Sequence, residues 1–179
     1  MRNNKTTTPN SIYDRTKCEL CGSDFWCVVI LSQNEIDVNA ATDSGATPLF
    51  ISSQEGHVEV VELLLATNDI DINNAENNNN GWTALHIAAE TGHIEVVRLL
   101  VSKAGIDINR ASRDFGFTAL YVAAEKGRVE IVRILLSTNG IDISVQHEST
   151  ALYIASENGH DEIVRLILLE RGSLIMAGC

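Results

Sequence analysis

Four segments of this chain have the same pattern of residues, and this repetition limits the fold more than any other feature of the sequence. The four copies can be aligned on a threonine in each, and successive threonines are 36, 35 and 32 residues apart: Thr47, Thr83, Thr118 and Thr150. A glycine follows nine residues after each threonine, at Gly56, Gly92, Gly127 and Gly159. A nearly constant period of this length is typical of proteins that stack one small structural unit several times.

Each copy is predicted to contain two helices. The threonine is a good N-cap, and Pro48 fits the first helical position, where its missing N–H costs no hydrogen bond. The glycine suits the left-handed residue that ends the first helix. In the clearest copy, Leu85, Ala88 and Ala89 form a narrow face of small side chains, which allows a neighbouring helix to approach closely. The second helix has larger apolar residues, and a turn such as 79–81 is expected to protrude between copies.

The motif Thr83-Ala84-Leu85-His86-Ile87-Ala88-Ala89 resembles the helix start of the ankyrin repeat family, and the segment 92–100 extends the match into the second helix. The resemblance covers roughly residues 42–172. It implies an all-α ankyrin-repeat solenoid of stacked helix-turn-helix units with protruding β-turn fingers. It also implies a non-enzymatic protein–protein interaction module that binds its partner through the concave surface of fingers and first helices.

The copies divide the chain into predicted units. We expect repeats at 42–77, 78–112 and 113–144, a C-terminal repeat at 145–172, a degenerate N-terminal capping repeat at 12–41, a flexible tail at 1–11 and an apolar tail at 173–179. The last unit has Leu169 where earlier units have Ala66, Ser102 and Ser137, so no polar C-terminal cap is evident. The apolar tail could fold back over this end, the chain could be cut from a longer protein, or the end could pair with another chain.

Composition and charge exclude several classes of function. The formal net charge of −11 argues against nucleic acid as a partner, since nucleic-acid binding depends on Lys and Arg. No apolar run approaches the roughly 18 residues that span a bilayer, and the N-terminus lacks a secretory signal. We therefore expect a cytoplasmic protein, with the nucleus as the alternative. In that environment Cys18, Cys21, Cys27 and Cys179 are expected to be free thiols.

No catalytic or cofactor-binding pattern emerges from the sequence. The C-x-x-C spacing of Cys18 and Cys21, with Cys27 six residues later, could bind zinc, but no fourth Cys or His follows at a suitable distance. The three histidines that follow the glycines, His57, His93 and His160, are predicted to lie too far apart to share a metal ion, and each ring is expected to form a local hydrogen bond. We therefore expect neither an enzyme nor a cofactor.

Residues that differ between copies are the candidates for partner recognition, because residues that maintain the fold recur. Trp82 and Phe117 precede two of the helix caps, and by the family resemblance they lie at finger tips, where Phe115 would join them in an exposed aromatic patch. The resemblance places a further set on the same groove: Gln54, Glu55, Glu90, Tyr121, Glu125, Lys126, Tyr153 and Glu157. The predicted partner is a protein with a basic or aromatic segment.

A second hypothesis is a structural spacer or a self-associating module that uses the uncapped C-terminal face. A monomer is expected under the first hypothesis and a dimer through that face under the second.

Overall fold

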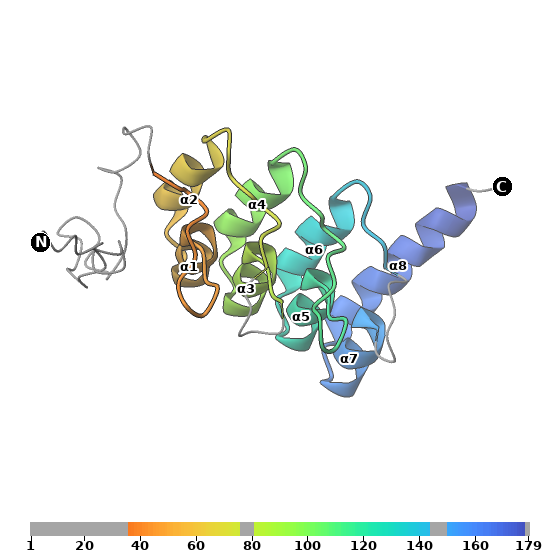
Figure 1. Cartoon of the computed structure of the whole chain (residues 1–179). Coiled ribbons are helices and arrows are strands. Elements are labelled where there is room, and N and C mark those ends of the chain that lie inside the picture. The colour runs from red at the N-terminus through yellow and green to blue at the C-terminus, as the bar shows by residue number, and fades with distance from the viewer. Residues whose placement is uncertain (1–35, 76–80, 144–149, 178–179) are drawn as a thin grey trace, which may run out of the picture.

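The computed structural model describes residues 36–75, 81–143 and 150–177, which contain eight α-helices and no β-strand. The helices form four consecutive pairs: α1 (Pro48–Glu55) with α2 (Val58–Leu65), α3 (Ala84–Thr91) with α4 (Ile94–Ser102), α5 (Ala119–Glu125) with α6 (Val129–Ser137), and α7 (Ala151–Glu157) with α8 (Asp161–Ala177). The pairs stand side by side along the chain (Figure 1). The predicted all-α solenoid is confirmed.

The repeated threonines and glycines define the ends of the first helices, as predicted. Thr47, Thr118 and Thr150 each accept a hydrogen bond from the backbone N–H three residues later. Such a cap contributes about 1 kcal/mol to stability. The glycine that follows each first helix has a positive φ, between 70° and 91°, in all four pairs. Any other residue would be strained at this position.

The core lies between neighbouring pairs rather than within one pair. The first helices contact one another in the order α1, α3, α5, α7, and the second helices in the order α2, α4, α6, α8. Small residues on the first helices, such as Ala88, Ala89 and Ala123, are fully buried, which allows the close approach expected from the sequence. A single pair cannot bury its apolar faces, so each unit depends on its neighbours.

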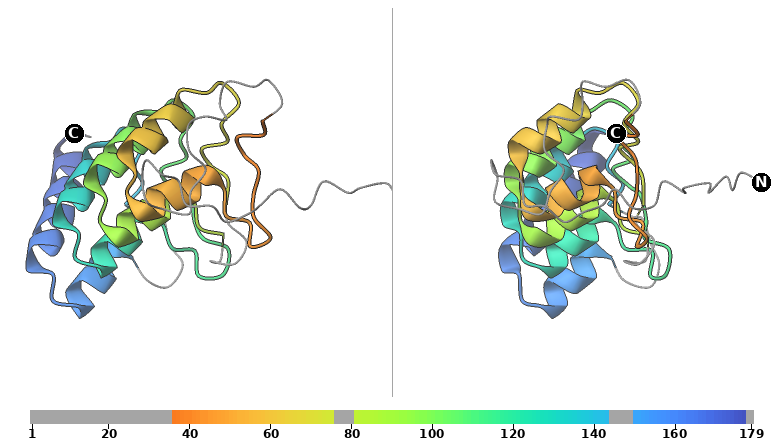
Figure 2. Two further views of the ribbon diagram at one scale, coloured as in Figure 1. Left: turned by 90° about the vertical axis from the view of Figure 1, so that its left-hand side faces the viewer. Right: turned by 60° about the vertical axis from the view of Figure 1, so that its left-hand side comes forward.

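The loops between pairs project to one side of the helices (Figure 2). Two finger turns lie wholly within the described residues. In the first, Thr42 N–H donates to the Ala46 carbonyl at 3.0 Å, and in the other, Ser112 N–H donates to the Phe117 carbonyl at 2.8 Å. The second turn is therefore one residue longer than the first. Residues 76–80 and 144–149, which include most of the turn predicted at 79–81 and most of the last finger, lie outside the described part of the chain.

A periodic set of asparagine side chains connects the loops of neighbouring units. The Asn73 amide donates to the Gly105 carbonyl at 2.8 Å and accepts from the Asp107 N–H at 2.8 Å. Asn109 makes the same two bonds to Gly140 and Asp142, and Asn39 makes them to Asp69 and Asp71. Each amide thus satisfies one donor and one acceptor of the next loop, and we call these three residues the asparagine ladder.

A second periodic contact joins the units at the glycines. The His93 ring bonds to the Gln54 carbonyl of the preceding unit at 3.0 Å, and the His160 ring bonds to that of Glu125 at 3.1 Å. In the unit between them, Arg128 replaces the histidine and donates to the Glu90 carbonyl. The predicted local hydrogen bonds of His93 and His160 are therefore wrong, because both rings reach across to the neighbouring unit.

The two ends of the chain differ in what the structure describes. Helix α8 continues through residue 177, so the predicted apolar tail does not fold back over the last unit and residues 173–177 extend the helix instead (Figure 1). The predicted tail at 1–11, most of the capping repeat at 12–41, and all four cysteines lie outside the described residues. No helix in the described ranges combines the length and apolar character that a bilayer span needs.

The asparagine ladder yields a test of how the units are held together. We expect Asn109→Ala to lower the free energy of unfolding by about 1–2 kcal/mol, because the Gly140 carbonyl and the Asp142 N–H both lose a partner. Urea denaturation measures this loss. Asn68→Ala is the matched control, since Asn68 is exposed outside the ladder, and it should change stability by less than about 0.5 kcal/mol. Equal effects of the two substitutions would contradict a structural role for the ladder.

Candidate protein-binding surface

Three aromatic rings form a continuous stack from the finger at 112–117 to helix α5. The rings of Phe115 and Phe117 are 5.3 Å apart and nearly parallel, and those of Phe117 and Tyr121 are 4.2 Å apart with an interplanar angle of 4°. Exposure decreases along the stack: Phe115 is 57% exposed, Phe117 is half-buried and Tyr121 is buried. The stack therefore holds the Phe115 ring in a fixed position at the surface.

Trp82 does not join this stack. It is half-buried against the apolar cluster of Ala46, Phe50 and Ile87, and its ring stacks on that of His86 at 5.9 Å. Its environment shows a packing role between the first two described units. The predicted aromatic patch of Trp82, Phe115 and Phe117 therefore reduces to Phe115 as its exposed member. Tyr121, predicted as a groove anchor, is buried beneath Phe117 and has little surface to offer.

His86 occupies the same position in its unit as Tyr121 does in the next, and it is also buried. Its Nδ1 accepts from the Thr83 N–H, so Nε2 is the atom that donates to the Phe117 carbonyl at 3.0 Å. Burial lowers the pKa of His86 from 6.5 to about 4, and the hydrogen bond to Phe117 offsets this only in part. The ring is therefore neutral at physiological pH and ties the finger that contains Phe117 to helix α3.

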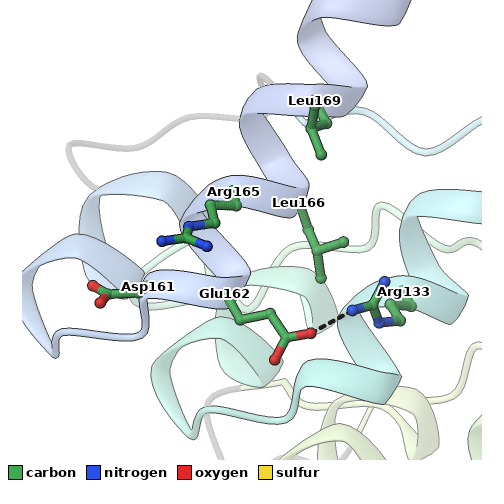
Figure 3. Close-up of a pocket in the computed structure, with 6 residues that line it drawn as sticks. All are labelled: Arg133, Asp161, Glu162, Arg165, Leu166 and Leu169. Carbon is green, nitrogen blue, oxygen red and sulfur yellow. Dashed lines mark hydrogen bonds and ion pairs between the residues drawn. The ribbon is translucent and has the colours of Figure 1, made fainter.

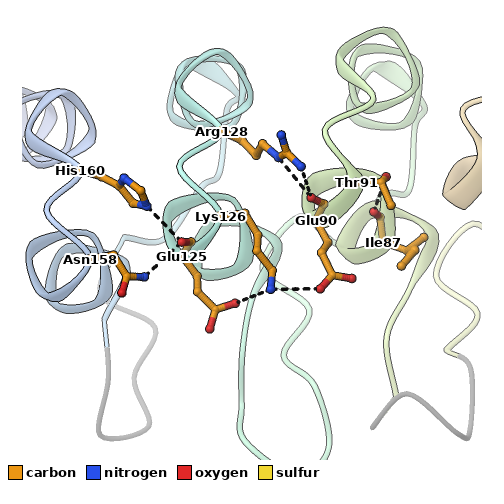
Figure 4. Close-up of polar contacts among 8 residues, drawn as sticks. All are labelled: Ile87, Glu90, Thr91, Glu125, Lys126, Arg128, Asn158 and His160. Carbon is orange, nitrogen blue, oxygen red and sulfur yellow. Dashed lines mark hydrogen bonds and ion pairs between the residues drawn. The ribbon is translucent and has the colours of Figure 1, made fainter.

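Charged side chains continue the surface at the ends of the first helices. The Lys126 ammonium group lies 3.3 Å from a Glu90 oxygen and 3.5 Å from a Glu125 oxygen. Desolvation acts to lower the pKa of Lys126, but the bonds to both carboxylates outweigh it and raise the pKa. Figure 4 shows that these three side chains point toward the loops, whereas Arg128 and His160 lie between the two rows of helices. Two of the acidic residues thus share one lysine as their partner.

The last unit adds an aromatic ring and an acidic group without such a cation. Tyr153 is 53% exposed, and its hydroxyl lies 3.5 Å from a carboxylate oxygen of Glu157. Glu157 is exposed and forms no ion pair within the described residues. Burial raises the pKa of Tyr121, and the negative charges of Glu125 and Glu157 raise it further, which puts both carboxylates near the aromatic stack. We use the name inner surface for Glu90, Phe115, Phe117, Glu125, Lys126, Tyr153 and Glu157.

Two residues that the sequence predicted for the binding groove are not part of the inner surface. Gln54 is half-buried and its carbonyl accepts from His93, so its main chain has a structural role, and Glu55 is exposed at the end of α1. Within the described residues, neither forms a hydrogen bond or an ion pair with the aromatic stack or with Lys126.

A shallow depression of about 450 Å³ lies on another part of the molecule, between α6 and α8. It is lined by Arg133, Asp161, Glu162, Arg165, Leu166 and Leu169. Figure 3 shows Arg133 and Glu162 paired across it, while Arg165 points away from α6. Two of its lining residues are leucines. Nowhere in residues 36–75, 81–143 and 150–177 do three His, Cys, Asp or Glu side chains gather as metal ligands would.

These features define a class of protein, a helical repeat array that presents a stacked aromatic and acidic surface. The family model for ankyrin repeats matches residues 18–112 and 105–177, and the chain belongs to the ankyrin repeat family. Ankyrin repeats generally mediate protein–protein interaction and are typically non-enzymatic. A comparison with curated proteins gave no significant match.

The buried His86 predicts how stability depends on pH. Its folded-state pKa lies below its unfolded-state value, so the unfolded chain binds the proton more readily between pH 6.5 and about 4. Stability should fall as pH is lowered through this window. At pH 4.5 the contribution of His86 is a loss of roughly 2–3 kcal/mol relative to pH 7.

Comparison with His86→Phe isolates this effect, since Phe50 occupies the same position in the first described unit. Urea denaturation at pH 7 and pH 4.5 should show a smaller difference in unfolding free energy for the variant. A difference as large as that of the natural chain would mean that other groups account for the acid sensitivity.

Proposed function

We propose that this chain binds a partner protein through the inner surface, and that the partner contributes an extended segment with basic and apolar side chains. The observation on which the proposal rests is the fixed, exposed ring of Phe115 at the end of the three-ring stack. A rigid aromatic side chain loses little conformational entropy when it binds, which is why such residues are frequent anchors at interfaces.

The charge of the inner surface supports a basic partner. Glu157 is next to the exposed Tyr153 ring and has no cation of its own, whereas Lys126 already pairs with Glu90 and Glu125. A lysine or arginine of the partner could pair with Glu157 and lie against the Tyr153 ring, which combines an ion pair with a cation–π contact. The net charge of −11 favours approach of a basic segment at low salt.

The aromatic part of the proposal is tested with peptides selected on the full chain from a random peptide library. We expect the double variant Phe115→Ala, Tyr153→Ala to bind the selected peptides at least about 10-fold more weakly, because both anchors are truncated. Fluorescence anisotropy measures the affinity. Leu63→Ala is the matched control: Leu63 is 39% exposed but lies on helix α2, and its loss should leave the affinity unchanged. Selected peptides that bind the double variant as tightly as the natural chain would refute the proposal.

The charge part is tested separately with Glu157→Gln. Peptides with lysine or arginine should bind this variant roughly 2- to 5-fold more weakly at low salt, with the difference shrinking as salt is raised. Glu59→Gln is the control, because it removes the same charge from an exposed position on α2. Equal effects of the two substitutions would show that net charge, rather than Glu157, determines the affinity.

A further inference from the structure

The outer face of α7 and α8, at the C-terminal end of the stack, exposes positions that earlier units bury. Tyr153 is 53% exposed, whereas the equivalent residues Phe50, His86 and Tyr121 are buried. Leu168 is 51% exposed, whereas the equivalents Leu65 and Leu136 are buried and Val101 is half-buried. Leu152 and Val164 are half-buried, whereas their equivalents in the earlier units are buried. We use the name end face for Leu152, Tyr153, Val164, Arg165 and Leu168.

Arg165 of the end face is equivalent to two arginines that form ion pairs with the following unit. Arg98 of α4 pairs with Glu130 of α6 at 3.0 Å, and Arg133 of α6 pairs with Glu162 of α8. Arg165 stands at the same position in its unit, six residues after the glycine. It has no ion pair within the described residues, and it points away from α6, toward the side where a following unit would lie (Figure 3).

The glycine of the last unit, Gly159, also lacks the contact that its equivalents make with a following unit. Side chains of the following unit cover Gly56, Gly92 and Gly127, so that an added Cβ would lie 2.4–3.0 Å from the nearest atom of His93, Arg128 or His160. At Gly159 an added Cβ would meet nothing within 4 Å. In the part of the chain that the structure describes, no side chain donates to the Glu157 carbonyl, although the equivalent carbonyls of Gln54, Glu90 and Glu125 each have such a donor.

We propose that the end face is a second docking surface, and that its occupant is a helical hairpin of repeat type. The three interfaces within the stack specify its chemistry. Its first helix has small residues, its second helix begins with a histidine or arginine that covers Gly159 and donates to the Glu157 carbonyl, and a glutamate two residues later pairs with Arg165. This inference does not depend on Phe115 or Lys126, and so goes beyond the proposed function of the inner surface.

A second copy of this chain, packed face to face, fits this surface less well. It would bring Arg165 of both copies to one interface and would offer neither the covering histidine or arginine nor the glutamate in the register that the other units use. The continuation of α8 through residue 177 extends the helix and does not turn back across α7 (Figure 1). The end face is therefore uncovered within the described residues.

The test is an NMR titration of the isotope-labelled full chain with a synthetic peptide of residues 118–138, which contains small residues, Arg128 and Glu130 in the required register. We expect saturable shift changes in α7 and α8, with a dissociation constant below about 1 mM, because the peptide must fold as it binds. Leu168→Glu should abolish these changes. Leu63→Glu, the matched control at the other end of the stack, should leave them intact.

A charge exchange tests the register. Arg165→Glu should weaken binding about 5-fold or more, and a peptide with Glu130→Arg should recover that loss on the Arg165→Glu chain alone. The proposal is overturned by an absence of shifts at about 1 mM peptide, or by shifts that survive Leu168→Glu. It is also overturned if sedimentation shows a dimer of the full chain that Leu168→Glu converts to a monomer, since a second copy would then be the occupant.

Discussion

Stacking between neighbouring helix pairs is the constraint on which this structure depends. No pair buries its own apolar faces, so each needs a neighbour in one register, and hydrogen bonds from side chains to the neighbouring backbone fix that register. His93, Arg128 and His160 reach back to carbonyls of the preceding unit, while the asparagine ladder connects the loops. Histidine and arginine can exchange at this position because both place an N–H donor over the glycine. Gly56, Gly92 and Gly127 are thus favoured for two reasons: their φ is positive, and a Cβ would lie 2.4–3.0 Å from the covering side chain.

The sequence predicts the elements well because their signals are local. A threonine cap, a glycine nine residues later and the spacing of small residues between them require only one unit to interpret, and the described helices begin and end as they indicate. Contacts between units are harder to predict from the sequence. An asparagine two residues after an aspartate does not indicate which backbone groups, about 30 residues away, it will bind. The periodicity of Asn39, Asn73 and Asn109 was a usable signal for a structural role. It could not indicate that one amide serves as donor and acceptor at once.

Exposure was the property hardest to predict. Tyr121 and Tyr153 occupy the same position in successive units and each follows a Thr-Ala-Leu sequence, yet one is buried and the other is 53% exposed. Two differences accompany this: Phe117 stacks on Tyr121, whereas Ser149 stands at the equivalent position before Tyr153, and a unit follows Tyr121, whereas none within the described residues follows Tyr153. For the finger at 112–117 the sequence held a clue, because Thr118 follows Asn109 by nine residues and Thr47 follows Asn39 by eight. The longer finger is the one that presents Phe115, stacked on Phe117.

Both candidate surfaces arise where the repeat pattern is interrupted, but they relate differently to stability. Phe115 is mostly exposed beyond the stacked core, so its replacement can change affinity with little effect on folding. The end face consists of residue types that elsewhere hold units together, such as Leu168 and Arg165, and no unit within the described residues covers it. A partner that docks there would extend the same cooperative stack, and its binding would therefore stabilise α7 and α8 directly. A partner on the inner surface would bridge fingers and first helices that are already fixed, which favours recognition by side-chain chemistry over recognition by fold.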